Sequence, residues 1–150
     1  MWLDAILAYL HFTSIFAFFA FLTVETMMMR GALDEKAVRL LGRVDLWYFG
    51  SAIAVLVTGF SRLMWGAKGP DFYLASWPFY AKVSLFVLVA ILSVGPTLRF
   101  IHWRRMFERD ASWTVPEAER KRVRRTIMIE VHIAALIPLL AVMMARGLGH

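Results

Sequence analysis

The sequence predicts an all-α integral membrane protein, in which residues 1–150 form one antiparallel four-helix bundle with both termini outside the membrane. Three observations lead to this prediction. Apolar residues make up 60% of the chain, whereas soluble domains average about 45–50%. These residues are grouped into four long runs, and the mean hydropathy is +0.62. The basic residues are concentrated in two of the connections between the runs.

Each apolar run is long enough to span a bilayer. The hydrocarbon core is about 30 Å thick, so a helix that rises about 1.5 Å per residue needs about 20 residues to cross it. Helices are expected because lipid offers no hydrogen-bond partners to backbone N–H and C=O groups. The predicted spans cover residues 2–29, 46–65, 77–101 and 127–145. They occupy most of the chain, so any function must reside in the bundle, in its loops or on a partner surface.

Several local features of the sequence indicate how the spans begin, where they are connected and where they bend. The first run begins with the uncharged and acidic residues 1–4 and is too long for a cleaved signal peptide, so we expect it to be retained. Gly69 and Pro70 mark the loop before the third run. Pro96 and Pro138 lie inside the third and fourth runs, where each removes one backbone hydrogen bond and predicts a kink.

The distribution of Lys and Arg predicts the topology. The chain has 17 of these residues against 11 Asp and Glu, which gives a net charge of +6. They concentrate in segments 30–43 and 104–125, whereas the loop 66–76 has only Lys68 and the C-terminal tail has only Arg146. The positive-inside rule places both basic segments in the cytoplasm, where we expect them to contact anionic lipid headgroups. This arrangement argues against nucleic acid as a partner.

Cysteine is absent from the sequence. Thiolate zinc sites, iron–sulfur clusters, covalently attached c-type haem, disulfides and cysteine nucleophiles are therefore excluded for this chain. Any cofactor must be held by other side chains.

Polar residues inside the spans are costly in lipid and therefore mark candidate functional sites. At about 100° per residue, each of the first three spans places its polar residues on one stripe, which we expect to face the bundle interior. In chain order, the stripes contain His11, Ser14 and Glu25; Ser51, Thr58 and Arg62; and Lys82, Ser93 and Pro96.

The predicted topology separates the polar residues by depth. Arg62 and Lys82 lie in the outer part of the membrane, together with His11 at about 13 Å below the outer end of its helix. The inner half holds carboxylates instead. Besides the cationic residues, we expect four further polar residues to be buried, namely Glu25, Asp45, Ser93 and Glu130.

The fourth span has two polar residues that cannot both face the bundle centre. Glu130 and His132 are two positions apart, which is about 200° around a helix. His132 also lies about 21 Å from the outer end of its helix, against about 13 Å for His11. Axial ligands of one haem should lie closer in depth, so a site with a single histidine, or a haem tilted between helices, would be needed.

Two kinds of role are open for each of the candidate ligands. His11 can be an interhelical hydrogen-bond partner or a ligand of haem or another metal, and His132 is a second candidate ligand. Arg62 and Lys82 can extend to the membrane surface or pair with the propionates of a cofactor.

Four stretches of the sequence carry a family resemblance: residues 68–73, 79–82, 93–100 and 144–147. The Ser-x-x-Pro-Thr and Met-Ala-Arg-Gly patterns within them are the more specific. These stretches resemble a bacterial family of predicted membrane proteins, domain-of-unknown-function family 2214, over essentially the whole chain. The resemblance implies a four-helix, multi-pass protein of the bacterial inner membrane and supplies no established activity.

The layout more distantly resembles HemJ-type protoporphyrinogen IX oxidases and copper-resistance membrane domains. In HemJ-like proteins a first-helix histidine and a lysine opening the third helix recur, and these match His11 and Lys82. The chain departs from that pattern because it has no lysine shortly before His11 and no histidine near Ser93.

Three functions are consistent with these features. The first is a bundle that binds haem b or another tetrapyrrole in a redox role, with His11, Arg62, Lys82 and His132 as the cofactor-binding residues. The second is a non-catalytic subunit or assembly factor of a larger membrane complex, or a homo-oligomer. The third is a proton or small-solute pathway. The sequence leaves open whether the protein is an enzyme.

Overall fold

The computed structural model describes residues 2–148, and each regular element in that range is an α-helix. Four of these helices are long and apolar enough to cross a membrane. The prediction of an all-helical protein with four helices long and apolar enough to cross a membrane is therefore confirmed. The elements are α1 (Trp2–Met28), α2 (Glu35–Trp65), α3 (Gly69–Leu74), α4 (Trp77–Arg109) and α5 (Glu117–Ala145).

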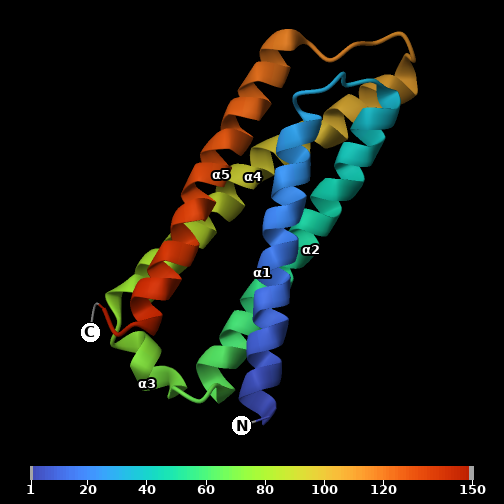
Figure 1. Cartoon of the computed structure of the whole chain (residues 1–150). Coiled ribbons are helices and arrows are strands. Elements are labelled where there is room, and N and C mark those ends of the chain that lie inside the picture. Colours follow the sequence, from blue (N-terminus) through green and yellow to red (C-terminus); the bar gives the residue numbers. More distant parts are fainter. Residues whose placement is uncertain (1, 149–150) are drawn as a thin grey trace.

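The connections between the long helices lie at the two ends of the molecule (Figure 1). Segments 29–34 and 110–116 lie together at one end, which we call the basic end because the arginine-rich parts of the chain adjoin it. The short helix α3 lies at the opposite end, near both ends of the described chain, and we call this the α3 end.

Three helices extend beyond the predicted apolar spans. At the basic end, α2 begins at Glu35, α4 continues to Arg109 and α5 begins at Glu117. The added turns are rich in Lys, Arg and Glu, which are good helix formers. Apolar runs mark the part of a helix suited to lipid, and the backbone stays helical beyond it.

Local sequence explains how the helices begin and end. Asp34 caps α2, since its Oδ1 accepts a hydrogen bond of 2.8 Å from the Ala37 N–H. At the other extreme of the chain, Gly147 follows α5 with a φ of 75°. The N–H groups of Gly147 and Leu148 donate to the carbonyls of Met144 and Met143, which is the Schellman arrangement.

The long helices form two hairpins. In one, α1 packs against α2, and in the other α4 packs against α5. The hairpins meet through less extensive contacts of α2 with α4 and of α1 with α5. The two hairpins are therefore the main structural units of the bundle.

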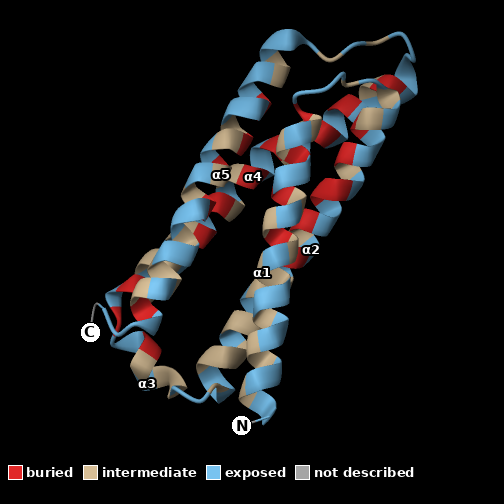
Figure 2. Ribbon diagram, in the orientation of Figure 1, coloured by how far each residue is buried: buried red, intermediate tan, exposed pale blue. Residues whose placement is uncertain are grey.

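The buried core is concentrated toward the basic end (Figure 2). Trp103 and Leu41 are fully buried there, and Phe100 is 1% exposed. Toward the α3 end, most of α1 and α2 is coloured as exposed or intermediate. The hairpins are thus held together mainly by one half of their length.

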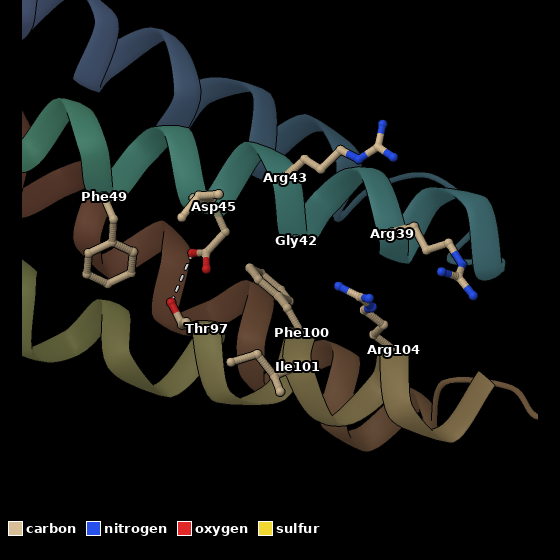
Figure 3. Close-up of a pocket in the computed structure, with 10 residues that line it drawn as sticks. Arg39, Gly42, Arg43, Asp45, Phe49, Thr97, Phe100, Ile101 and Arg104 are labelled. Atoms are coloured by element: carbon tan, nitrogen blue, oxygen red, sulfur yellow. Dashed lines mark hydrogen bonds between the residues drawn. The ribbon is translucent and has the colours of Figure 1, made fainter. Parts of the chain in front are cut away.

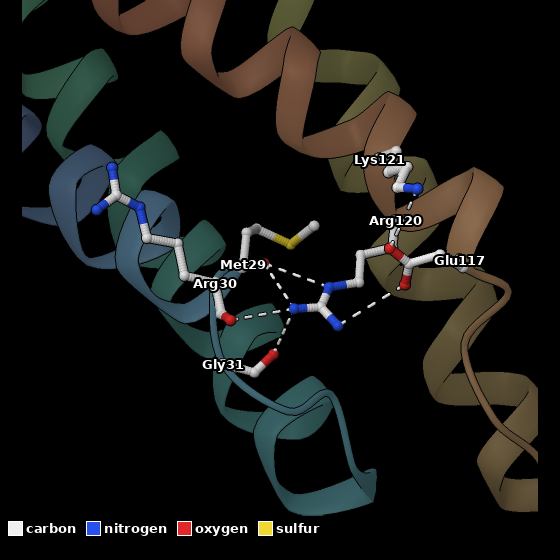
Figure 4. Close-up of polar contacts among 6 residues, drawn as sticks. All are labelled: Met29, Arg30, Gly31, Glu117, Arg120 and Lys121. Atoms are coloured by element: carbon white, nitrogen blue, oxygen red, sulfur yellow. Dashed lines mark hydrogen bonds and ion pairs between the residues drawn. The ribbon is translucent and has the colours of Figure 1, made fainter.

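Arg120 joins the hairpins at the basic end (Figure 4). Its guanidinium donates hydrogen bonds to the carbonyl oxygens of Arg30 and Gly31, at 3.1 and 2.9 Å, and to that of Met29 at 3.4 Å. These carbonyls lie just after α1, where helices leave backbone acceptors unpaired. A cation from α5 therefore caps the C-terminal end of α1.

Candidate functional site

His11 lies on α1, is half-buried and faces α2. Its Nδ1 is 2.9 Å from Thr58 Oγ1, and that hydroxyl donates its own hydrogen to the Ala54 carbonyl at 2.6 Å. The tautomer with the proton on Nδ1 satisfies both contacts, since Thr58 then accepts from His11 while it donates to Ala54. Nε2 is then the unprotonated nitrogen, which is the form that ligates a metal.

A glycine on α2 allows the His11 ring to approach closely. A Cβ built on Gly59 would lie 3.1 Å from Cε1 of His11, which is tighter than ordinary van der Waals contact. The ring therefore rests directly on the backbone of α2, one residue beyond its hydrogen-bond partner.

Arg62 and Lys82 lie close enough to His11 to interact with it electrostatically, and they also interact with each other. We call these three residues the cationic cluster. Its members come from α1, α2 and α4 and lie toward the α3 end. The structure thus brings together three of the four residues predicted to bind a cofactor.

Aromatic rings surround the two charged members of the cluster. The guanidinium carbon of Arg62 is 5.7 Å from the centre of the Phe12 ring, and Nζ of Lys82 is 5.2 Å from that of Phe79 and 5.8 Å from that of Tyr73. Nε of Arg62 is buried and has no hydrogen-bond partner among the described residues. Within residues 2–148, neither cation forms an ion pair.

The structure places His132 away from the cationic cluster. His132 is exposed on α5, and its Nδ1 donates a 2.6 Å hydrogen bond to the Met128 carbonyl of the preceding turn. Glu130, two residues earlier, is 1% exposed. The described residues contain no group of three or more His, Cys, Asp or Glu side chains that could hold a metal ion.

A second group of polar residues lies nearer the basic end. Glu25 on α1, Asp45 on α2 and Glu130 on α5 are 2%, 6% and 1% exposed, respectively. Glu25 interacts electrostatically with the other two carboxyl groups, and Glu130 does so with Asp45. We call these three residues the acid cluster. Oε1 of Glu25 and Oε1 of Glu130 are buried and have no hydrogen-bond partner among residues 2–148.

Hydroxyl groups of α2 and α4 adjoin the acid cluster. Thr97 Oγ1 donates a 2.9 Å hydrogen bond to Oδ1 of Asp45. The Tyr48 side chain interacts with those of Glu130 and Ser93. Ser93 is 2% exposed and donates to its own helix, at the Ala90 carbonyl.

A groove of about 400 Å³ between α2 and α4 leads from the basic end to the acid cluster (Figure 3). Asp45 and Thr97 point toward each other across it, while Arg39 and Arg104 lie nearer the basic end. Both arginines already have acidic partners, namely Glu35 and Glu108. The rest of the groove is mainly apolar and includes Leu46, Phe49, Phe100 and Ile101.

Aromatic rings separate the acid cluster from the cationic cluster. The Phe18 ring centre lies 5.0 Å from that of Tyr48 and 5.6 Å from that of Phe86. These rings come from α1, α2 and α4. On α1 and α2 they lie between residues of the two clusters, and on α4 Phe86 lies between Lys82 and Ser93, which adjoins the acid cluster. We call these rings the aromatic layer.

A comparison with protein families identifies the chain. The family described as "Predicted membrane protein (DUF2214)" matches residues 3–149. The protein belongs to this family. The family resemblance stated from the sequence is confirmed, and its description agrees with the four candidate spans.

Membership of the DUF2214 family assigns a place in the membrane and leaves the activity open. No curated protein and no solved structure matches the chain. The resemblance to HemJ-type oxidases therefore stays a hypothesis. The chemistry of this DUF2214 protein must be inferred from its own side chains.

Sequence reasoning did not find several residues that adjoin the cationic cluster or line the groove. Gly59 was missed, although a glycine directly after the polar Thr58 was a signal that a side chain could lie against the helix backbone. Arg39 and Arg104 were read as part of the basic segments, because their place at the groove depends on how α2 and α4 pack. The sequence does not show this packing.

Proposed function

We propose that this membrane protein binds an anionic cofactor of the tetrapyrrole class, with haem b as the leading candidate, at the cationic cluster. The proposal is supported by the convergence of His11, Arg62 and Lys82 from three helices without a carboxylate partner among the described residues. Two half-buried cations are stabilised when an anion lies between them. The propionates of a tetrapyrrole are anions of this kind.

The residues of the cluster fit such a group in two respects. Nε2 of His11 would hold the iron, because the tautomer that donates from Nδ1 to Thr58 leaves Nε2 unprotonated. Arg62 and Lys82 can pair with the propionates. His132 faces away, so the fit is to a single histidine ligand. A bound haem would supply one-electron redox chemistry, while the protein binds and orients it and sets its polarity.

An absorption spectrum of the protein purified in detergent from haem-replete cells tests the proposal. We expect a Soret band that is lost in His11→Ala and retained in His132→Ala, which removes an exposed histidine. Arg62→Gln and Lys82→Gln should weaken retention of the cofactor while the protein still folds. A colourless wild-type preparation would contradict the proposal.

The remaining alternatives make different predictions in the same preparation. A colourless protein that co-purifies with one larger complex, or as a defined homo-oligomer, would instead be a non-catalytic subunit or assembly factor. A proton relay along the whole bundle receives less support, because the aromatic layer lies between the acid cluster and His11.

The orientation we propose is an antiparallel, up-and-down bundle in the bacterial inner membrane, with the basic end in the cytoplasm and both termini outside. The charge of segments 30–43 and 104–125 supports it, and these segments would lie against anionic headgroups. Since the chain has no cysteine, single-cysteine variants provide a clean test. Ser112→Cys should resist an impermeant thiol reagent in intact cells, and Ala67→Cys should react. The reverse pattern would refute the orientation.

A further inference from the structure

The acid cluster lies in the buried core of the bundle, and its members have no positive partner among the described residues. Glu25 and Glu130 are at least 98% buried. Within the described residues, no ion pair involves Glu25, Asp45 or Glu130. An ionised carboxylate is strongly destabilised away from water unless a positive charge compensates it, and neighbouring carboxylates add mutual repulsion. The site therefore needs a proton or another small cation.

Two oxygen atoms are placed to receive that charge. Oε1 of Glu25 and Oε1 of Glu130 are shielded from solvent and have no hydrogen-bond partner in the part of the chain that the structure describes. Buried polar atoms of this kind are rare in native structures and call for a reason. A proton on either carboxyl group would remove the charge and make that group a hydrogen-bond donor.

The geometry favours a proton over a metal ion. Metal ions require several ligands around one point, and the described carboxyl groups do not converge in this way. A proton needs only one oxygen and can be shared among neighbours. The groups that face the site are Glu25 from α1, Asp45 and Tyr48 from α2, Glu130 from α5, and the non-ionisable Ser93 and Thr97 from α4.

The surroundings give the site access from one end. The groove between α2 and α4 reaches Asp45 and Thr97 from the basic end. In the opposite direction, the aromatic layer of Phe18, Tyr48 and Phe86 lies between the site and the cationic cluster, and these rings also line a smaller pocket of about 200 Å³. Asp45 lines the groove, whereas the more deeply buried Glu25 and Glu130 do not.

We infer that Glu25, Asp45 and Glu130 form a proton-binding site that is loaded from the basic end through the groove between α2 and α4. This site is separate from the cationic cluster and does not depend on a bound cofactor. Asp45 is the entry residue, and Glu25 and Glu130 hold the proton.

Infrared spectroscopy of the full-length protein in detergent tests the occupancy. A buried protonated carboxyl group gives a C=O stretching band that shifts in D2O and is distinct from the carboxylate bands. We expect such a band at neutral pH, with a measurable loss of intensity in Glu25→Gln or Glu130→Gln. The control is Glu117→Gln, because the Glu117 side chain is 63% exposed and should not contribute.

A second variant tests the route without altering the carboxyl groups. Gly42 lines the groove, and a Cβ added there meets no atom within 4 Å. Gly42→Leu should fill the groove, leave the band intensity unchanged and slow its H/D exchange several-fold. Gly50→Leu is the matched control, since Gly50 is exposed on the same helix and also has open space beside it.

Three outcomes would overturn the inference. The first is the absence of a protonated carboxyl band at neutral pH, or a band that both glutamate variants leave intact. The second is a band that appears only when Na⁺ is withdrawn, which would make Na⁺ the occupant. The third is unchanged exchange in Gly42→Leu, which would exclude the groove as the route. Circular dichroism of each variant confirms that it is folded.

Discussion

Arg120 places a positive charge on the carbonyl groups that follow α1. Its side chain is 27% exposed, and its guanidinium bonds to the carbonyls of residues 29–31 and lies 3.9 Å from Glu117. Carbonyl groups at the end of a helix carry partial negative charge, which a cation stabilises. A single side chain thus connects α5 to the end of α1, a helix far from it in sequence.

Replacement of Arg120 by alanine should lower the stability of the protein. We expect a loss of about 1–3 kcal/mol, because hydrogen bonds from a charged donor are removed and the α1 carbonyls lose their cap. Thermal unfolding in detergent, followed by circular dichroism, measures the effect. Arg122→Ala is the control, since Arg122 is exposed on the same helix. Equal melting temperatures for the two variants would show that the cap contributes nothing.

Asp110, in the connection before α5, illustrates a local charge effect outside the membrane spans. The hydroxyl of Ser112, at 2.6 Å, and its backbone N–H, at 2.9 Å, donate to Oδ1 and hold the pKa of Asp110 below its usual value. The folded loop therefore favours the ionised form. The resulting stabilisation is present above the usual aspartate pKa and is lost as the pH falls through the lowered one.

Ser112→Ala should raise the pKa of Asp110 toward the ordinary value of about 3.9, because the hydroxyl donor is lost while the N–H donor remains. NMR titration of the labelled aspartate carboxyl carbon in detergent micelles measures the pKa of Asp110. An unchanged pKa would mean that the hydroxyl bond is absent in solution.

At the scale of the helices, small residues decide where two elements touch closely. Gly59 of α2 lies against His11 of α1, whereas Gly50 of the same helix has open space where a Cβ would lie. Alanine favours the helix over glycine at both positions. Glycine has the same low helix propensity at both positions, so the two positions differ only in what surrounds them.

Gly50→Ala should stabilise the protein by about 0.5–1 kcal/mol, the usual difference in helix propensity. In Gly59→Ala the new methyl group displaces the His11 ring and weakens its bond to Thr58. The stability of this variant should therefore be lower than that of Gly50→Ala by about 1 kcal/mol, which is the typical net contribution of one hydrogen bond. Chemical unfolding in a mixed micelle compares the pair. Equal gains in stability for the two variants would show that the His11 ring moves at no cost in free energy.

The apolar part of each long helix could be predicted from the sequence, whereas the full lengths of α2, α4 and α5 could not. Hydropathy located spans near residues 2–29 and 77–101 because lipid requires apolar side chains over a fixed thickness. The extra turns of α2, α4 and α5 are amphipathic or charged, so they carry no such signal. The short α3 was read as a loop because Gly69 and Pro70 are typical of turns, although proline also suits the first turn of a helix.

At the scale of the whole molecule, packing is uneven along the bundle. The largest buried side chains, Trp103, Tyr48 and Phe100, lie in the half near the basic end. Trp103 also donates a 2.9 Å hydrogen bond from Nε1 to Glu119 of α5, and Glu119 lies 3.6 Å from Arg99. This half holds the two hairpins together.

Trp103→Ala should therefore destabilise the bundle severely. Truncation of a fully buried tryptophan costs about 3–5 kcal/mol, and Glu119 also loses a donor. Trp65→Ala is the control, because Trp65 is 62% exposed and a substitution there should change stability by about 0.5 kcal/mol or less. Unfolding in increasing mole fractions of a denaturing detergent measures both. Similar midpoints would argue that the core lies elsewhere.

The two clusters could be anticipated in part at this scale. Helical periodicity placed His11, Arg62 and Lys82 on inward stripes, and the structure brings them together. The sequence did not show whether Glu130 or His132 faces the bundle interior, because the two residues lie on opposite faces of the same helix. In the structure Glu130 is buried and His132 is exposed. Which residue of such a pair faces inward depends on how α5 is rotated against α4, and that is set by packing over the whole helix.

The uneven packing has a mechanical consequence. Two rods packed together near one end, and joined at the other by the short α3, behave as levers, so a small change of angle at the packed end becomes a larger displacement at the other. Over a bilayer of about 30 Å, a rotation of about 5° would move the far end by about 3 Å. Bilayer thickness would therefore change the spacing between His11 and Lys82 up to the limit that α3, which contacts both α2 and α4, allows.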